Sequence, residues 1–445
     1  MTPITLRSTG IIDGLSRRSW SAVLLALTLT GLATSARAQQ YFVATPDDNA
    51  RGYVTAAQTS TKDAATYAAK KQEFDDYFKK YYFPSMTQTD PDKLAKIGKL
   101  REDLFKNFLW KTSNAQLQQD LTALTLAEMK TYLAAQNPPC HPTTRYNAIL
   151  TVGMLDDQYS PDGRTHPKPS VAANKVLTIV VDSATTKNLF PPPVILGAII
   201  GLERHAQFSA SLPPESVKAM TAALLKLVTT EKPIQEMDRD TYSWLRLRAA
   251  SALAKLKSAG EQNAVNNAIV KLAATGKSLD DRCEAAGLLE NLTYKDVKLD
   301  DANTAEPLFA LARDLAAAED KRAQDFQERG SAGGVMPVMP MSRGEGFNPT
   351  GGTAIPETFP RRHVLSRLKE LYNGLNAVKA SLPTETQKKA DAVLAALNTA
   401  IASASSKDTV ELKLTVALQT MAKEINAAIP GAVKPGDEKA KEAVF

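Results

Sequence analysis

The side chains best suited to metal chemistry are three methionines in the run VMPVMPM, namely Met336, Met339 and Met341. Thioether sulfurs are soft ligands that suit copper(I), and the M-x-x-M-x-M spacing could bring several of them to one ion. Methionine and proline together also make adaptable apolar contacts with a partner. The sequence therefore leaves copper(I) binding and apolar contact open for this cluster.

Other residues that could do chemistry lack partners at a diagnostic spacing. The chain has four histidines, and it contains no H-E-x-x-H, C-x-x-C, G-x-x-x-x-G-K or G-x-S-x-G motif. Adjacent Cys140 and His141 supply two of the four ligands that a zinc ion usually takes, which favours a loop cap. His205 is expected to pack as a structural histidine rather than line a groove. We therefore assign no catalytic residue and no cofactor.

Four stretches of the chain share one helical pattern, in which a small residue is followed by bulky residues four and seven positions later. The small residues are 50, 51 and 36 positions apart, so helical hairpins with loops or extra turns between them are expected to stack. In the second copy His205 stands where the others carry leucine. The four stretches are TRYNAILTVGML around Ala148, LGAIIGLERH around Ala198, LRLRAASALAKL around Ala249 and DRCEAAGLLENL around Ala285.

Three copies carry an arginine three residues before the alanine, and the fourth has Ile195 there; the arginines are Arg145, Arg246 and Arg282. Over about residues 140–292 the pattern resembles the HEAT repeat. In that family an aspartate and an arginine link neighbouring repeats by hydrogen bonds, which the resemblance implies for Asp240 and Arg246. Pro139 and Leu189 occupy the acidic place in two other copies, so the ladder is incomplete. The resemblance implies a degenerate α-solenoid.

The N-terminus has the features of an export signal. Arg7, Arg17 and Arg18 precede an apolar run at 22–32, and Ala36-Arg37-Ala38 fits an A-x-A cleavage site. That run is shorter than the roughly 20 residues of a membrane-spanning helix. We expect cleavage after Ala38 and a mature protein without an integral membrane segment, periplasmic or extracellular. Both the general secretory route and the twin-arginine route stay open.

The charge of the chain gives no reason to expect nucleic acid or an anionic membrane as a partner. The formal charge of +6 falls to +3 without residues 1–38, which hold four arginines and one aspartate. Phe74, Tyr77, Phe78 and Tyr81 share one face of an expected helix, between lysines. Such a stripe could stack on bases, but a core role is favoured.

The two cysteines are predicted to be buried free thiols. Cys140 and Cys283 lie three repeats apart, and stacked helices would separate them by roughly 25 to 30 Å. A disulfide needs α-carbons within about 7 Å. An exported protein could form a bridge, but an in-order stack forbids this one.

The expected fold class is all-α. No segment shows strand alternation, and the β-branched run VLTIVVD at 176–182 is predicted to be a buried helix. The expected segments are a signal peptide at 1–38, an N-terminal helical region at 39–139, HEAT-like repeats at 140–329, a disordered Gly/Pro/Met linker at 330–360, a small helical bundle at 361–430 and a disordered tail at 431–445.

Three functional hypotheses follow. The first is an exported, non-enzymatic scaffold that binds a protein or peptide partner through its helical repeats. The second is an envelope protein that binds a small ligand, or copper through Met336, Met339 and Met341. The third is an enzyme whose site has no linear motif. The identity of the partner and the oligomeric state stay open.

Overall fold

The computed structural model describes residues 40–135, 137–160, 166–187, 189–234, 237–331, 359–406 and 409–430. The predicted signal peptide, most of the predicted linker, the predicted tail and the cluster of Met336, Met339 and Met341 lie outside these residues. The described part is almost wholly helical, so the all-α prediction is confirmed. The run at 176–182 is helical, as predicted.

One pair of short strands corrects the expectation that no strand forms. β1 (Asp156–Gln158) pairs antiparallel with β2 (Lys168–Pro169). These strands carry mainly polar and charged residues, so no apolar alternation could reveal them. Apart from this pair and one isolated bridge, the described chain contains helices, turns and loops.

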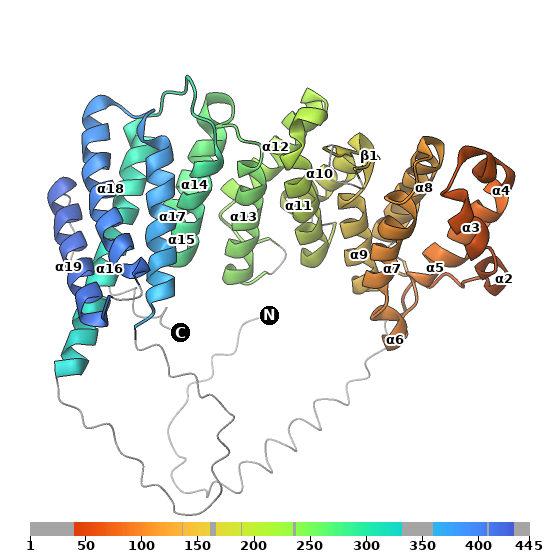
Figure 1. The fold of residues 1–445 in the computed structure, drawn as a ribbon, viewed down its shortest axis with the longest axis horizontal. Coiled ribbons are helices and arrows are strands. Elements are labelled where there is room, and N and C mark those ends of the chain that lie inside the picture. The colour runs from red at the N-terminus through yellow and green to blue at the C-terminus, as the bar shows by residue number, and fades with distance from the viewer. Residues whose placement is uncertain are drawn as a thin grey trace, which may run out of the picture.

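Most helices stand side by side in two layers along the long axis of the molecule, in chain order (Figure 1). In the first layer each helix contacts the next one. Gly153 approaches Gly201, and four residues earlier Ile149 approaches Gly197, so these two neighbours run in the same direction. The first layer consists of α7 (Ile97–Leu104), α9 (Pro142–Gly153), α11 (Pro192–Gln207), α13 (Arg239–Ala254), α15 (Leu279–Gly287) and α17 (Arg361–Lys379).

The second layer packs against the first, again with each helix contacting the next. It consists of α10 (Val171–Thr186), α12 (Pro214–Thr229), α14 (Ala264–Thr275), α16 (Glu306–Ser331) and α19 (Glu411–Ala428). Hairpins form where the connection is short: α10 packs on α11, α12 on α13 and α14 on α15. Asp238 accepts hydrogen bonds from the backbone N–H of Asp240 and Thr241 (2.9 and 2.8 Å) and so begins α13.

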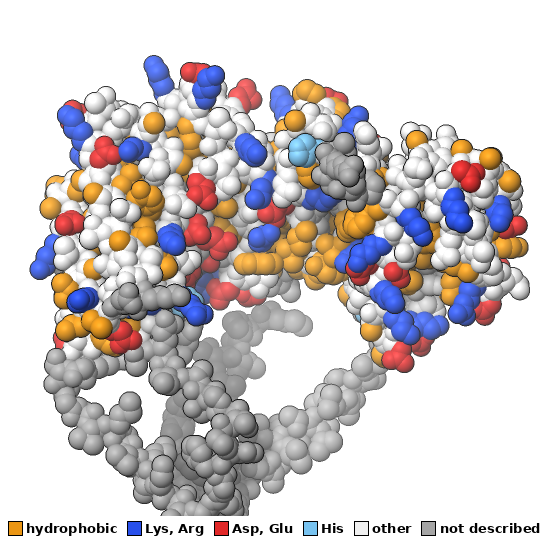
Figure 2. Space-filling model, in the orientation of Figure 1, with side chains coloured by type: hydrophobic (Ala, Val, Ile, Leu, Met, Phe, Trp, Pro, Cys, Tyr) orange, Lys and Arg blue, Asp and Glu red, His pale blue; other side chains and the backbone are white. Residues whose placement is uncertain are grey.

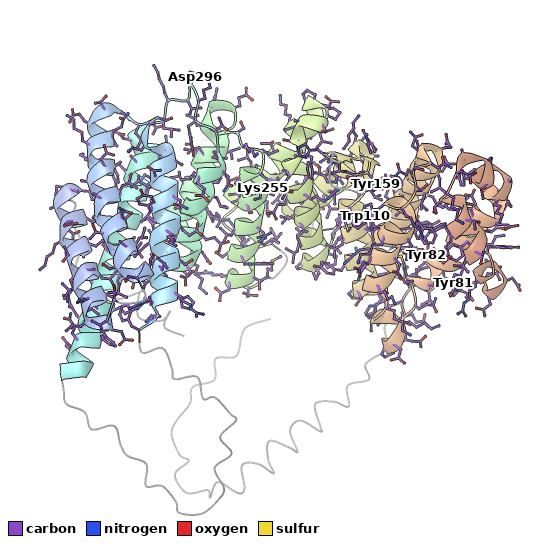
Figure 3. All side chains as sticks on the ribbon, viewed as in Figure 1. Tyr81, Tyr82, Trp110, Tyr159, Lys255 and Asp296 are labelled. Atoms are coloured by element: carbon purple, nitrogen blue, oxygen red, sulfur yellow. The ribbon has the colours of Figure 1, made fainter. Side chains whose placement is uncertain are left out.

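The N-terminal helices form an aromatic end to the array. Phe74, Tyr77 and Phe78 are buried and Tyr81 is half-buried, which confirms their predicted core role. Tyr81 and Tyr82 lie beside each other at this end (Figure 3). The helical segments here are α2 (Asp48–Arg51), α3 (Val54–Ser60), α4 (Ala64–Asp76), the π-helical η2 (Tyr77–Tyr82), α5 (Phe83–Ser85), α6 (Pro91–Leu94), the π-helical η3 (Phe105–Leu109) and α8 (Ala115–Ala134).

The helices expected as a C-terminal bundle pack directly on the preceding ones. α17 lies against α15, α19 lies against α16, and α18 (Thr384–Ser405) packs on both α17 and α19. One continuous apolar core runs from Ala57 to Ile429. The helices of residues 361–428 therefore share a core with the rest of the array.

The four alanines of the sequence pattern lie in four successive helices of the first layer. Ala148, Ala198, Ala249 and Ala285 lie in α9, α11, α13 and α15, and each is fully buried. A small residue lets neighbouring backbones approach each other, while the bulkier residues one turn later fill the space between the layers.

Candidate functional site

The three arginines of the pattern have one structural role in common. Arg246 donates from Nε to the carbonyl of Val228 (2.8 Å), Arg282 from Nε to that of Ala273 (2.9 Å) and Arg145 from Nη2 to that of Leu133 (3.4 Å). Each acceptor lies within the last turn of the helix that precedes the arginine. Carbonyls at helix C-termini lack partners within the helix and carry partial negative charge. An arginine there supplies both a hydrogen-bond donor and a positive charge.

This arrangement corrects the expected link between Asp240 and Arg246. Asp240 is exposed and forms an ion pair with Lys277, whereas the buried Arg246 lies over the Tyr242 ring and reaches Val228. Six residues along a helix amount to a rotation of about 240°, so the two side chains leave α13 on different faces.

Polar contacts between neighbouring helices of the first layer use other residues. Glu203 of α11 accepts from Arg248 Nη2 (2.6 Å) and Ser251 Oγ (2.9 Å) of α13. Ser243 of α13 donates to Asp281 of α15 (2.9 Å). Asp280 of α15 accepts from Arg367 of α17 (2.5 and 3.0 Å). These contacts join helices far apart in the sequence, so no local spacing could have identified them.

The histidines and cysteines flagged by the sequence have structural surroundings. Burial lowers the pKa of His205 to about 3, with a further contribution from Arg204, and its Nδ1 lies 3.3 Å from the Asn174 amide. His141 Nδ1 accepts from the backbone N–H of Thr143 (3.2 Å) at the start of α9, in agreement with a loop cap. His205 therefore has a packing role, and His141 caps the start of α9.

Cys140 and Cys283 are buried and form no disulfide, as predicted. Burial raises the pKa of Cys140 to about 11 and that of Cys283 to about 12, so neither thiol ionises near neutral pH. Within the described residues no group of three or more His, Cys, Asp or Glu side chains could hold a metal ion.

Apolar side chains reach the surface across three adjacent helices of the first layer. Two of them are strongly exposed for their type, Ile200 on α11 at 37 % and Trp244 on α13 at 47 %. Ile200 lies one turn before Glu203, and Trp244 lies one turn before Arg248, the residue that pairs with Glu203. The two side chains are therefore neighbours across the α11–α13 contact. We call the set the apolar strip; it comprises Tyr146, Leu150, Leu196, Ile200 and Trp244.

Acidic side chains gather beside the apolar strip. Glu284 of α15 is exposed, and Glu370 of α17 is half-buried with its carboxylate over Gly287. Glu290 is exposed in the short helical turn η6 (Leu288–Asn291) that follows α15. We call these three residues the acidic cluster. Figure 2 shows hydrophobic side chains gathered at the middle of this face and acidic ones directly beside them, where Figure 1 draws α13 and α15.

The Glu370 carboxylate lies over a missing side chain. A Cβ at Gly287 would collide with Oε2 of Glu370, so the carboxylate in this conformation occupies the space of a side chain at position 287. Burial raises the pKa of Glu370, and the charges of Glu290 and Glu284 raise it further. Burial also raises the pKa of Glu284, with a contribution from Asp281 that Arg248 opposes. None of the three forms an ion pair within the part of the chain that the structure describes.

A cleft of about 770 Å³ lies elsewhere, between α12 and α14. Its apolar lining includes Leu212, Val217, Leu225, Leu256 and Val265. The loop on its rim contains three residues other than glycine with left-handed backbone, Lys257 (φ 56°), Gln262 (φ 51°) and Asn263 (φ 62°). Such strain persists where the surroundings impose it. The loop is held by hydrogen bonds from Thr293 N to Lys257 O (3.2 Å) and from Asn263 Nδ2 to Lys298 O (3.0 Å).

In the described ranges, no helix combines the length and apolar character needed to cross a membrane. Comparisons with models of known protein families, with curated proteins and with solved structures found no match to this chain.

Proposed function

We propose that the chain is an exported, non-enzymatic scaffold that binds a protein or peptide partner along the first layer of a degenerate HEAT-like α-solenoid. The four buried alanines in successive helices and the in-order contacts of two helix layers support the repeat interpretation. Export rests on the sequence of residues 1–38. The Gly/Pro/Met linker predicted at 330–360 belongs to the same proposal.

The observation that carries the proposal is the apolar strip. Isolated exposed apolar residues are common, but a contiguous set rimmed by charge is typical of a contact surface. Trp244 in particular presents a large ring near the middle of one helix layer, and tryptophan is enriched among residues that dominate binding energy. The residues around it are fixed by packed helices, so a partner would meet a rigid surface.

Site-specific photo-crosslinking tests this function. A benzophenone amino acid replaces Trp244 in the full chain, and a matched chain carries it at Ile179, which is 52 % exposed on α10 of the second layer. Expressed in the native cells, the first chain should yield a discrete adduct with one protein, identified by mass spectrometry. Equal adducts from both positions, or none from position 244, would remove the support for a scaffold.

The cleft between α12 and α14 favours a second candidate function, the binding of a small apolar ligand. Its volume of about 770 Å³ is within the range of ligand pockets, which are mostly apolar with a few polar groups. Native mass spectrometry of protein purified from its source would show a bound small molecule. Copper(I) binding by Met336, Met339 and Met341 is a separate proposal, and equal affinity of the triple leucine variant would reject it.

A further inference from the structure

We propose that the apolar strip and the acidic cluster together receive a basic amphipathic segment of a partner protein, with lysine or arginine side chains beside a row of apolar ones. This inference rests on the proposed scaffold function and adds the chemistry of the partner. The apolar strip supplies the contact area, and the acidic cluster selects the charge of the segment that covers it.

The apolar strip and the acidic cluster lie next to each other. Ser243 on α13 bonds to Asp281 on α15, so Trp244 lies next to the contact that joins these helices. Arg248, one turn after Trp244, is close enough to Glu284 to oppose the rise in its pKa. Apolar surface and unpaired carboxylates therefore meet along the α13–α15 boundary.

The arginines near the acidic cluster already form ion pairs with other acids. Arg248 is bonded to Glu203 at 2.6 Å, and Arg367 bonds both to Asp280 at 2.5 Å and to Glu319 at 3.0 Å. The charged neighbours that influence Glu370 are both negative, Glu284 and Glu290. A cation brought by a partner would relieve this repulsion, because opposite charges in a partly buried site attract more strongly than in water.

The width of this surface sets the length of the partner segment that would cover it. Packed helices lie about 10 Å apart, so α11 to α15 spans about 20 Å. About 6 residues of extended chain or 13 residues of helix cover that length. A short segment can therefore place an apolar side chain on Ile200 and Trp244 and a basic one on Glu284 or Glu370.

Binding of a synthetic probe tests the inference. The probe is a fluorescently labelled 14-residue peptide with leucines along one helical face and lysines elsewhere. One matched peptide has glutamate in place of every lysine, and another has serine in place of every leucine. Fluorescence anisotropy with the full chain should show binding of the first peptide and at least about tenfold weaker binding of the other two.

Variants of the chain locate that binding. Glu284→Gln with Glu370→Gln should weaken the lysine–leucine peptide about tenfold, and Trp244→Ala should do the same. Two controls should leave affinity unchanged: Glu328→Gln with Glu424→Gln, which neutralises exposed acids on α16 and α19, and Ile179→Ala. Equal losses in the control pair would overturn the site, since they would reflect overall charge. Circular dichroism establishes that each variant is folded.

The photo-crosslinked adduct from position 244 distinguishes the basic partner segment from the scaffold function on which that inference rests. A partner segment rich in lysine or arginine, with an adduct lost in the Glu284→Gln, Glu370→Gln background, supports both. An adduct that persists in that background, on a segment without basic residues, leaves the scaffold standing and overturns the basic partner. If the probe bound to a chain that begins at residue 39 but not to the full chain, residues 1–38 would be the segment that covers the site. That result would overturn a partner protein as its occupant.

Discussion

Two helix contacts within the first layer use glycine for opposite purposes. Between α9 and α11, a Cβ at Gly153 would lie 2.7 Å from the Cα of Gly201, so the two backbones touch. Between α15 and α17, Gly287 makes room for the Glu370 carboxylate, next to Glu284 and Glu290. The missing side chain serves packing at Gly153, whereas at Gly287 it leaves space beside like charges. The α15–α17 contact also packs backbones closely, where Gly374 of α17 meets the Ala286 backbone of α15.

The two contacts therefore differ in their effect on the stability of the fold. Close packing of backbones favours the folded state through dispersion and exclusion of water. Three neighbouring carboxylates that form no ion pair within the described residues work against it. A folded chain tolerates such a cost where the residues serve another purpose, which is consistent with a partner at the α13–α17 surface.

The largest effect is expected from filling the close contact between Gly153 and Gly201. Gly201→Val places carbon atoms against Gly153 and Leu177, both within 3.0 Å of the first added atom, and should cost about 3 kcal/mol or more of unfolding free energy. Chemical denaturation followed by circular dichroism measures this. Gly98→Ala in α7 meets nothing nearer than 4.0 Å and should instead gain about 0.5 kcal/mol. Equal effects at both positions would contradict the close α9–α11 packing.

A smaller loss is expected from removing an arginine that holds a helix end. Arg246→Ala deletes a buried donor and leaves the Val228 carbonyl without it, at a cost of about 2 kcal/mol. Lys218→Ala, an exposed cation on α12, should change stability by less than about 0.5 kcal/mol. If Asp240→Ala proved as costly as Arg246→Ala, the expected aspartate–arginine link would regain support over the contact with Val228.

The same substitution should have opposite signs in the paired and unpaired acids. Glu203→Gln weakens bonds to Arg248 and Ser251 and should cost about 1 kcal/mol. Glu370→Gln removes repulsion from Glu284 and Glu290 and should gain about 0.5 kcal/mol at pH 7. Two losses of equal size would show that Glu370 has a favourable partner in solution.

The pH dependence sharpens this contrast. The pKa of Glu370 is raised in the folded state by burial and by its acidic neighbours, so its ionised form lowers stability above that pKa. The penalty lessens as the pH falls through the raised pKa and is absent below the usual pKa of glutamate. The advantage of Glu370→Gln should therefore disappear in acid, which denaturation at several pH values will show. An advantage that is constant with pH would point to a cause other than charge.

The smallest structural effect concerns one cysteine in each region. Cys140 precedes α9 and Cys283 lies in α15, and both are buried with raised pKa. A thiol reagent at pH 8 should leave the native protein unmodified for many minutes and titrate both thiols after denaturation without a reductant. Recovery of no thiol after denaturation would mean a disulfide and would contradict the in-order stack of helices.

Much of the fold was predictable because its signals are local. Ala148, Ala249 and Ala285 recur with bulky aliphatic residues four and seven positions later, and that spacing predicts a buried helix face without knowledge of the neighbour. The run at 176–182 was assigned to a helix from its flanks, and it forms part of α10. The polar strands β1 and β2 carried no such signal and were missed.

The candidate site was not predictable in the same way. Trp244 and Ile200 are apolar residues on helices with buried faces, and nothing local distinguishes them from core residues. Arg246 was recognised as a special position, but its partner was wrong, because a helical spacing does not say which neighbouring helix end a side chain reaches. The acidic cluster joins Glu284 with Glu370 across 86 positions of sequence.

The sequence by itself determined the helical class and the burial of the four alanines, since both follow from the 3.6-residue period of a helix. Only the tertiary structure decided which side chains meet. The rotation and height of each helix against the next depend on many packing contacts at once, and those contacts set Gly153 against Gly201 and Glu370 over Gly287.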